Sequence, residues 1–232
     1  FERVFEVLDL EPLIQEKPDA TVVPEGPVSV EFDDVRFAYP SADKVSLASL
    51  EEVATLDTRG GEEVLHGVSF RIEPGQTVAL VGTSGAGKST IAQLLSRLYD
   101  VDSGAVRLAG ADVRDVTFAS MRHTLGMVTQ DGHLFHETIL SNLRLARPEA
   151  TDDEVWDAVR RARREPLIRS LPDPRDTKVG GRGYRLSGGE RQRMTIARLL
   201  LAQPRVVILD EATAALDSTS EAAVQAALSE AL

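Results

Sequence analysis

The stretch "LVGTSGAGKST", residues Leu80–Thr90, places three glycines and a lysine between an apolar run and the start of a helical pattern. Gly82, Gly87, Lys88 and Ser89 complete the pattern G-x-x-x-x-G-K-[S/T], which is typical of a phosphate-binding loop. Its glycines let the backbone curl so that N–H groups point at phosphate oxygens, and the following helix adds the positive end of its dipole. The sequence therefore predicts a site for a nucleoside triphosphate.

The residues of this loop receive separate predicted roles. We expect the Lys88 ammonium to contact the outer phosphates and the Ser89 hydroxyl to ligate Mg²⁺, while backbone N–H groups hold the remaining oxygens. The alternative is a glycine-rich turn with a solvated lysine, which leaves the apolar run before the loop and the helix after it unexplained. The nucleotide-binding residues predicted in the loop are Gly82, Thr83, Ser84, Gly85, Ala86, Gly87, Lys88, Ser89 and Thr90.

A second segment, "VVILDEAT", adds two carboxylates to the predicted site. Its apolar strand, residues 206–209, delivers Asp210 at the carboxyl end, where open α/β sheets place their sites. We expect Asp210 to hold the Mg²⁺ shell and Glu211 to polarise an attacking water. A pair of solvent-facing carboxylates at a strand end is the alternative, and the phosphate loop in the same chain makes it the weaker one.

Composition narrows the class of protein. The 232 residues allow one or two domains, and a formal net charge of −11 argues against sequence-independent binding to nucleic acid. The chain contains no cysteine, which excludes disulfides and thiolate chemistry within it. Since no apolar run approaches the roughly 18 residues of a membrane helix, we expect this segment itself to be a soluble folded unit. The arginine-rich stretch Val159–Arg169 is interpreted as a solvated helix face rather than a nucleic-acid or lipid patch.

The order of patterns along the chain indicates the fold class. Alternating strands come first, a buried strand leads into the phosphate loop and its helix, and an arginine-rich helical region precedes the last helix and strand. Strands separated by helices predict a mostly parallel sheet with helices on both faces, interrupted by an inserted helical region. The fold class is therefore α/β.

The segment "LSGGE", Leu186–Glu190, followed by the helix "RQRMTIARLL", resembles the signature of the ATP-binding cassette (ABC) ATPases. Ser187, Gly188 and Gly189 precede a helix and leave its N-terminal N–H groups open to an anion. The resemblance implies a head-to-tail dimer, in which this signature covers the nucleotide of a second nucleotide-binding domain. Glu190 stands where glutamine is commoner, which we expect to weaken contacts across the interface.

Further motifs follow in the family's order. The resemblance implies that Tyr39 stacks on adenine, although it could equally be a packed surface residue. It also implies that Gln130 reaches Mg²⁺ and the attacking water, and that Asp217, in "AALD", lies at the dimer interface. The implied catalytic residues are Glu211, Gln130 and Lys88, the metal ligands are Ser89, Gln130 and Asp210, and the residues that contact ATP outside the loop are Tyr39, Gln130, Ser187, Gly188, Gly189, Glu190 and Asp217.

The resemblance also implies domain boundaries. The fold is a P-loop NTPase (RecA-like) core with an antiparallel β subdomain and an inserted helical subdomain at about 135–186. Residues 1–27, which begin "FERVFEVLDLEP", resemble the linker from a missing transmembrane domain, and residues 28–232 are the nucleotide-binding domain. Residues 41–63 are expected to be an insertion with a short helix.

Two departures from the family pattern modify these expectations. Gly181 replaces the usual glutamate of the loop before the signature, which puts in doubt a carboxylate contact with the membrane domain. The family's switch histidine comes after the position of Leu232, and His66, His123, His133 and His136 all come too early to replace it. We therefore expect the 232-residue fragment to bind MgATP better than it hydrolyses it.

The sequence analysis favours the ATPase domain of an exporter at the cytoplasmic face of a membrane, with ATP and Mg²⁺ as cofactors. The partners are a second nucleotide-binding domain and its own transmembrane domain, without nucleic acid. A non-hydrolysing nucleotide-gated module, a soluble ABC ATPase acting on ribosomes or DNA, and an importer subunit are the alternatives. The transported substrate stays open, because the residues that would touch it lie outside this chain.

Overall fold

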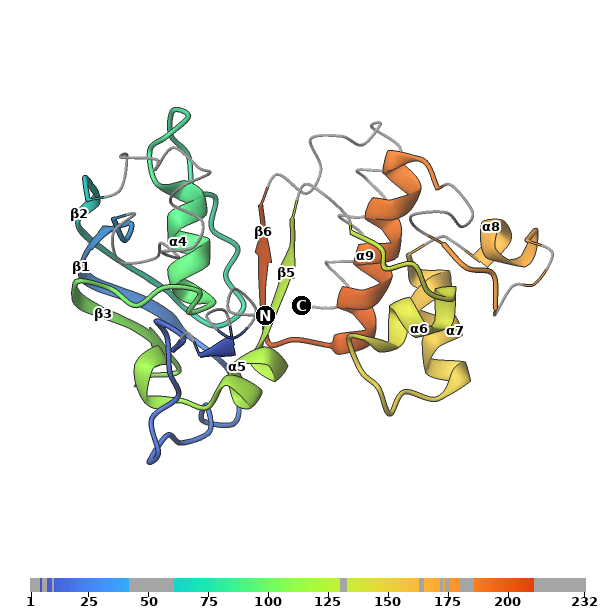
Figure 1. Cartoon of the computed structure of the whole chain (residues 1–232), viewed down its shortest axis with the longest axis horizontal. Helices are drawn as coiled ribbons and strands as arrows, with labels where there is room; N and C mark the ends of the chain where they lie inside the picture. The colour runs from blue at the N-terminus through green and yellow to red at the C-terminus, as the bar shows by residue number, and fades with distance from the viewer. Residues whose placement is uncertain are drawn as a thin grey trace. The chain divides into compact units, whose positions relative to one another are not determined.

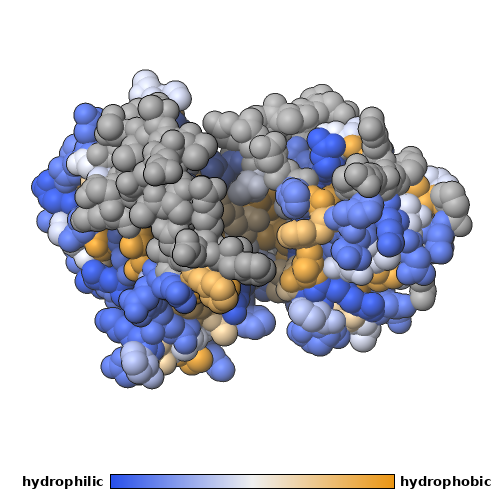
Figure 2. Space-filling model, in the orientation of Figure 1, coloured by the Kyte–Doolittle hydropathy of each residue, from blue (hydrophilic) through white to orange (hydrophobic). Residues whose placement is uncertain are grey.

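The structure is a computed structural model that forms two compact units, Phe1–Met121 and Arg122–Leu232, each described here by itself (Figure 1). The residues that the structure describes are 5, 8–9, 11–41, 61–129, 133–162, 165–171, 173, 176–179 and 186–210. Most of the insertion predicted at 41–63 lies outside them. Among the described residues, no helix combines the length and the apolar character needed to cross a membrane. Among the residues coloured by hydropathy in Figure 2, hydrophilic ones predominate, with apolar patches between them.

An antiparallel sheet forms the first unit. Its strand order is β2-β1-β3-β4, so the first strand of the sequence lies at the centre and pairs with both neighbours. Side chains alternate along β1, and Phe32, Val35 and Phe37 are each no more than 2% exposed. The alternation predicted from residue 28 onward therefore produces the expected antiparallel subdomain. The strands are β1 (Val30–Ala38), β2 (Glu63–Ile72), β3 (Ser103–Leu108) and β4 (Ala111–Asp112).

Helix α4 (Lys88–Leu95) follows the phosphate loop in the first unit. Its buried residues include Ala92, Leu94 and Leu95, which recur at helical spacing and turn one face toward the core. After β4, a short 3-10 helix, η1 (Val113–Asp115), leads into α5 (Phe118–Thr124).

The run before the phosphate loop differs from its prediction. We expected a buried strand there, but residues 76–83 form no strand, and Val78, Leu80 and Val81 are 48%, 42% and 93% exposed. A continuous apolar run is typical of a strand in a parallel sheet that is covered on both faces. The described parallel strands, β5 and β6, both belong to the second unit, so the described part of the first unit contains no parallel sheet that this run could join.

Parallel strands and a helical lobe form the second unit. Strand β5 (Leu125–Val128) pairs in parallel with β6 (Val206–Leu209). A Cβ placed on Gly126 would lie 2.4 Å from Leu199 Cδ1, so the missing side chain lets β5 approach α9 closely. The helices are α6 (Ile139–Arg144), α7 (Asp152–Arg161), α8 (Glu165–Arg169) and α9 (Gly188–Ala202), and α6 to α8 lie within the region predicted to be helical.

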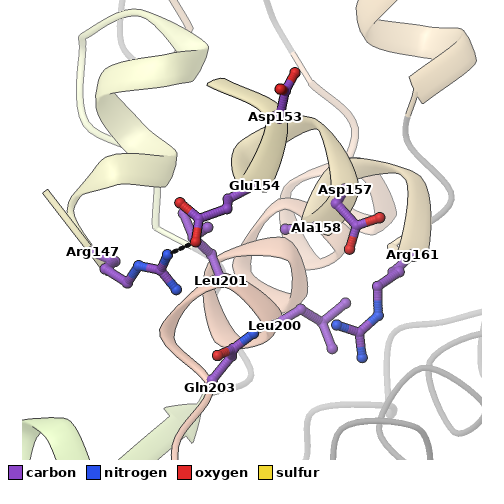
Figure 3. Close-up of a pocket in the computed structure, with 9 residues that line it drawn as sticks. All are labelled: Arg147, Asp153, Glu154, Asp157, Ala158, Arg161, Leu200, Leu201 and Gln203. Carbon is purple, nitrogen blue, oxygen red and sulfur yellow. Dashed lines mark hydrogen bonds and ion pairs between the residues drawn. The ribbon is translucent and has the colours of Figure 1, made fainter. Parts of the chain in front are cut away.

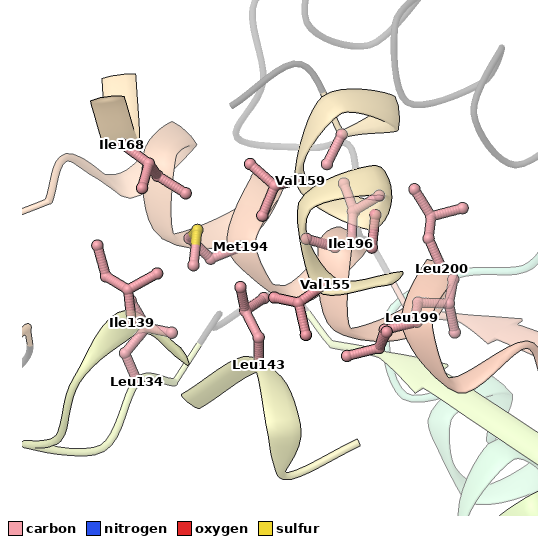
Figure 4. Close-up of a cluster of buried hydrophobic side chains, with 14 of the residues drawn as sticks. Leu134, Ile139, Leu143, Val155, Val159, Ile168, Met194, Ile196, Leu199 and Leu200 are labelled. Carbon is pink, nitrogen blue, oxygen red and sulfur yellow. The ribbon is translucent and has the colours of Figure 1, made fainter. Parts of the chain in front are cut away.

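The core of the second unit gathers around α9 (Figure 4). Met194 and Ile196 of α9, each 1% exposed, lie in one cluster with side chains from all three other helices. Burial of each large apolar side chain stabilises the fold by about 1.5–3 kcal/mol. The cluster therefore fixes α9, the helix that carries the signature, within its lobe. Its other helical members include Ile139, Leu143, Val155, Val159, Ile168, Leu199 and Leu200.

Candidate nucleotide-binding site

The glycines of the phosphate loop have separate structural tasks. Gly85 and Gly87 have φ of +83° and +85°, in the left-handed region that side chains with a Cβ rarely adopt. A Cβ on Gly87 would also lie 2.7 Å from Leu65 Cδ2, whereas one on Gly85 would meet nothing within 4 Å. Gly87 therefore serves both the turn and the close packing of the loop on β2.

Helix α4 begins directly after a glycine, which has no side chain to cap the helix. Its N-cap is Gly87, no side chain accepts a hydrogen bond at the cap, and its first turn contains no acidic residue. The first N–H groups of a helix have no partner within the helix, and the helix dipole adds partial positive charge there. This helix end is therefore suited to bind an anion.

Lys88 lies across the phosphate loop. Its Nζ donates to Gly82 O at 2.9 Å and to Thr83 O at 2.8 Å, while Ala86 N donates to Thr83 O at 3.2 Å and closes the turn. An ammonium group, the N–H groups of a helix start and the Ser89 hydroxyl thus come from one short segment. Donors of these kinds suit phosphate oxygens and Mg²⁺, and the contacts of this loop with a nucleotide and a metal stay predictions.

Tyr39 lies against the helix of the phosphate loop. Its hydroxyl donates to Gln93 Oε1 at 2.8 Å, which leaves Thr90 Oγ1, 2.9 Å away, to donate to the tyrosine oxygen. The half-buried ring makes edge contacts with Phe37 and Tyr99 at centroid distances of 5.0 and 5.3 Å. These contacts fix the tyrosine beside α4, while stacking on adenine stays a prediction.

The predicted signature is the N-terminus of α9, and side chains cap it. Ser187 N donates to Glu190 Oε2 at 2.7 Å, and Glu190 N donates to Ser187 Oγ at 3.3 Å, which is a reciprocal capping box. A Cβ on Gly188 would meet nothing within 4 Å, so the first turn has an open surface. The sequence analysis missed this box, although the spacing S-x-x-E is its signal.

Asp210 follows β6 at the carboxyl end of the parallel pair. Its backbone N donates to Val128 O, at the end of β5, at 2.9 Å. In the sequence, Gln130 comes two residues after the end of β5, so two of the three predicted magnesium ligands follow the ends of neighbouring strands along the chain. Gln130, Gly181, Glu211 and Asp217 lie outside the described residues. The phosphate loop belongs to the first unit, and Asp210 and the signature belong to the second.

Arg198 of α9 and Asn142 of α6 form a polar connection that the sequence analysis missed. Arg198 Nε donates to Asn142 O at 2.7 Å, Nη2 to Asn142 Oδ1 at 2.6 Å, and Nη1 to His133 O at 2.7 Å. The fully buried Asn142 amide also donates to Phe135 O at 3.0 Å. Desolvation lowers the pKa of Arg198. The segment that follows Gln130 is thus fixed to the signature helix.

A cavity of about 290 Å³ lies elsewhere in the helical lobe, beside α7 and the end of α9 (Figure 3). Its lining includes the Arg147–Glu154 ion pair and the apolar side chains of Ala158, Leu200 and Leu201. No predicted nucleotide-binding residue is among its described lining residues, so we do not assign the nucleotide to it. They are Arg147, Asp153, Glu154, Asp157, Ala158, Arg161, Leu200, Leu201 and Gln203.

Comparison with known families identifies the fold. The sequence profile described as "ABC transporter" matches residues 65–214, which is more than half of the chain. The chain belongs to the ABC transporter family. The match includes the phosphate loop, the signature and the strand that ends at Asp210, so the predicted family and the α/β P-loop NTPase fold are confirmed.

Relatives of this ABC domain include exporters. "ABC transporter aclQ" of Aspergillus oryzae is 47% identical over 98% of this chain and 26% of its own length. "ATP-binding cassette sub-family B member 6" of Mus musculus is 44% identical over 98% of this chain and 25% of its own length. "Structure of a bacterial Atm1-family ABC exporter with ATP bound" aligns with a TM-score of 0.85 and 39% identity, covering 100% of this chain and 37% of that one. The chain spans about a quarter of the length of these two curated relatives.

Proposed function

We propose that this ABC domain binds and hydrolyses MgATP as the motor of an exporter. It pairs with a second nucleotide-binding domain and drives a transmembrane domain of its own polypeptide, at the cytoplasmic face of a membrane. The uncapped start of α4 beneath the phosphate loop carries the proposal, because it presents N–H groups and the Lys88 ammonium to a phosphate. The exporter relatives support the transport assignment.

Different residues of this chain bind the phosphates, hold the metal ion, orient the attacking water and orient the adenine. The loop N–H groups and Lys88 bind and orient the phosphates, the Ser89 hydroxyl and Asp210 hold the magnesium shell, and Glu211 orients the attacking water. Bound Mg²⁺ supplies charge neutralisation at the phosphate oxygens. Tyr39, which is fixed beside α4 by its contact with Gln93, orients the adenine ring of the nucleotide.

Two anion-binding helix ends in one chain support a dimer. Helix α4 suits the nucleotide of its own subunit, and the start of α9 suits a phosphate presented by a partner. Because the second contact forms only on closure, ATP favours the closed dimer and shifts the attached membrane domain. Hydrolysis removes this preference and resets the cycle.

The experiment uses the full-length polypeptide in lipid nanodiscs, with MgATP binding and phosphate release as measurements. We expect binding and turnover for the wild type, and strongly weakened binding with loss of turnover for Lys88→Ala. Arg169→Ala is the matched control, because this exposed arginine contacts Glu165 of its own helix. A protein that neither binds nor hydrolyses ATP, or whose activity is unchanged by Lys88→Ala, would refute the proposed function.

A further inference from the structure

The segment before β1 is attached to the first unit by contacts along its whole length. We call residues Gln15–Val23 the N-terminal strap. It contains no helix or strand, and most of its side chains are exposed, as a linker requires. Its backbone nevertheless forms a parallel bridge between Thr21 and Val116, and Val23 is only 2% exposed. Composition alone predicts an exposed linker, yet the strap is docked.

The bridge is built from backbone hydrogen bonds on both sides of Val116. Thr21 N donates to Asp115 O at 2.9 Å, and Thr117 N donates to Thr21 O at 2.8 Å. Farther along, Val23 N donates to Ser120 Oγ at 2.6 Å. These bonds fix the strap to the segment from η1 to α5, whatever the strap's side chains are.

Side chains add contacts at the other end of the strap. Glu16 Oε2 accepts a hydrogen bond from Phe118 N at 2.5 Å, and Lys17 forms an ion pair with Asp115. Both residues of the strap are exposed. They can therefore be altered without disturbing the core.

Arg97 joins the strap to the phosphate-loop helix. It lies two residues after the end of α4, and its side chain is 2% exposed. Its Nη2 donates to Gln15 O at 2.9 Å, its Nε donates to Asp100 Oδ1 at 3.0 Å, and its guanidinium lies 5.1 Å from the Phe118 ring centroid. One buried cation thus contacts the strap, the loop after α4 and α5.

Two features of Arg97 are unfavourable for stability. Its φ is +52°, in the left-handed region, and within the described part of the chain its buried Nη1 has no hydrogen-bond partner. Backbone strain and an unsatisfied buried donor both cost free energy, and an apolar residue would avoid the second cost. Because both costs fall on one residue, we infer that the guanidinium of Arg97 has a functional role where the strap, the end of α4 and α5 meet.

We propose that Arg97 is a positioning residue that couples the phosphate-loop helix to the chain preceding the strap. Helix α4 is continuous from Lys88 to Leu95, so a displacement of its phosphate-binding start as a unit is carried to its end, about 12 Å away. Arg97 passes the displacement to the Gln15 carbonyl, and the docked strap moves with α4. This inference rests on the proposed function, in which the preceding chain leads to the membrane domain.

The test measures amide hydrogen exchange of the full-length protein in nanodiscs, with and without MgATP. In the wild type we expect MgATP to slow exchange in the segment upstream of Gln15. In Arg97→Ala we expect the strap amides of Thr21 and Val23 to exchange at least about tenfold faster, and the upstream response to MgATP to disappear. The dissociation constant for MgATP should stay within about twofold of the wild type, because Arg97 does not touch the phosphate loop.

A strap-side variant covers the case in which Arg97→Ala does not fold. Glu16→Gln combined with Lys17→Ala weakens the docking from exposed positions and should reduce the upstream response in the same direction. Arg71→Ala is the matched control, since Arg71 pairs with Glu31 and Glu73 on the exposed surface of the same unit. Its upstream response should equal that of the wild type.

A rescue experiment separates positioning from a purely structural role. These 232 residues contain no cysteine, so after replacement of any cysteine elsewhere in the full-length polypeptide by serine, Lys17→Cys and Asp115→Cys can be joined by a short thiol-reactive cross-linker. Because the cross-link attaches the strap to Asp115 and not to α4, we expect it to restore protection of the strap amides in Arg97→Ala without restoring the upstream response. A wild-type upstream response in Arg97→Ala, with or without the cross-link, would overturn the inference. Absence of MgATP binding in the wild type would instead refute the proposed function.

Discussion

Helices α4 and α9 both begin at a predicted phosphate contact, but their N-termini are built differently. Helix α4 starts after Gly87, with no side-chain cap and no acid in its first turn. Helix α9 starts after Ser187, and the Ser187–Glu190 capping box occupies its end. An uncapped end binds an anion directly, whereas a capped end is already partly satisfied and carries a carboxylate.

The difference indicates two kinds of phosphate site. The α4 end gains stability only when an anion arrives, so it is suited to hold nucleotide in each subunit. The α9 end is stable by itself and need contribute only when a partner presents its nucleotide. Binding in one subunit and closure of two subunits are thus separable steps, and substitutions at the two ends should affect different measurements.

The largest effect is expected for Lys88→Ala. The variant removes the ammonium that lies on the carbonyls of Gly82 and Thr83, and with it the only side-chain cation of the loop sequence. Hydrogen bonds to charged groups contribute about 1.5–3 kcal/mol, so MgATP affinity should fall about 10- to 100-fold. Equilibrium binding with a fluorescent ATP analogue measures this, and an affinity within twofold of the wild type would contradict the assignment of the α4 end.

The next largest effect on stability and MgATP affinity is expected from two single alanine substitutions in the loop, which are compared with each other. Gly85→Ala and Gly87→Ala both force a Cβ into the left-handed region, at a cost of about 1–2 kcal/mol. Only at Gly87 does the new Cβ also overlap Leu65, at 2.7 Å. We therefore expect Gly87→Ala to lower the thermal unfolding midpoint and MgATP affinity more than Gly85→Ala. Equal effects would show that the contact with β2 does not position the loop.

The family and the loop before α4 could be predicted because their signals are local. A glycine pattern before a helix specifies a turn, and the structure has this turn at Gly85–Gly87 followed by α4, while the contacts of Gly82–Ser89 with nucleotide stay predictions. The strand expected at residues 77–81 depends on neighbours from elsewhere in the chain, and the first unit leaves this segment exposed. The Arg198–Asn142 connection joins residues 56 positions apart, which no local pattern reveals. The docking of the strap does not appear in the sequence for the same reason, because its partners lie between 82 and 102 positions away.

A smaller effect is expected at the other helix end, from Glu190→Gln. Glutamine preserves the capping box but removes a negative charge from the face predicted to meet a partner's phosphate. Relief of this repulsion is worth about 1 kcal/mol, so MgATP-dependent association should strengthen about fivefold. Binding of nucleotide to α4 in the same chain should not change.

Salt dependence provides the control for Glu190→Gln. Screening shortens the range of exposed charges, so the advantage of the variant should shrink as ionic strength rises. Sedimentation of Glu211→Gln protein, which we expect to retain ATP, with and without the second substitution measures the association. Weaker association of the double variant at low salt would show that the Glu190 carboxylate favours closure of the dimer. That result would contradict our view that this charge repels the partner's phosphate.

The smallest effect concerns the second capping box, at Thr151 and Glu154 of α7, which faces no predicted phosphate. The Thr151 backbone N–H and the Arg147 guanidinium lower the pKa of Glu154. Its stabilisation is therefore present above the ordinary glutamate pKa and is lost as pH falls through the folded-state value. Glu154→Gln should lower the unfolding midpoint by about 1–3 °C at pH 7, with a difference that narrows in acid. Thermal unfolding of both proteins across this pH range measures the difference in unfolding midpoint. The capping box of α7 contains no predicted phosphate contact, so Glu154→Gln should leave MgATP-dependent association unchanged. A change in association would contradict the view that this box only stabilises the fold, unlike the box of α9.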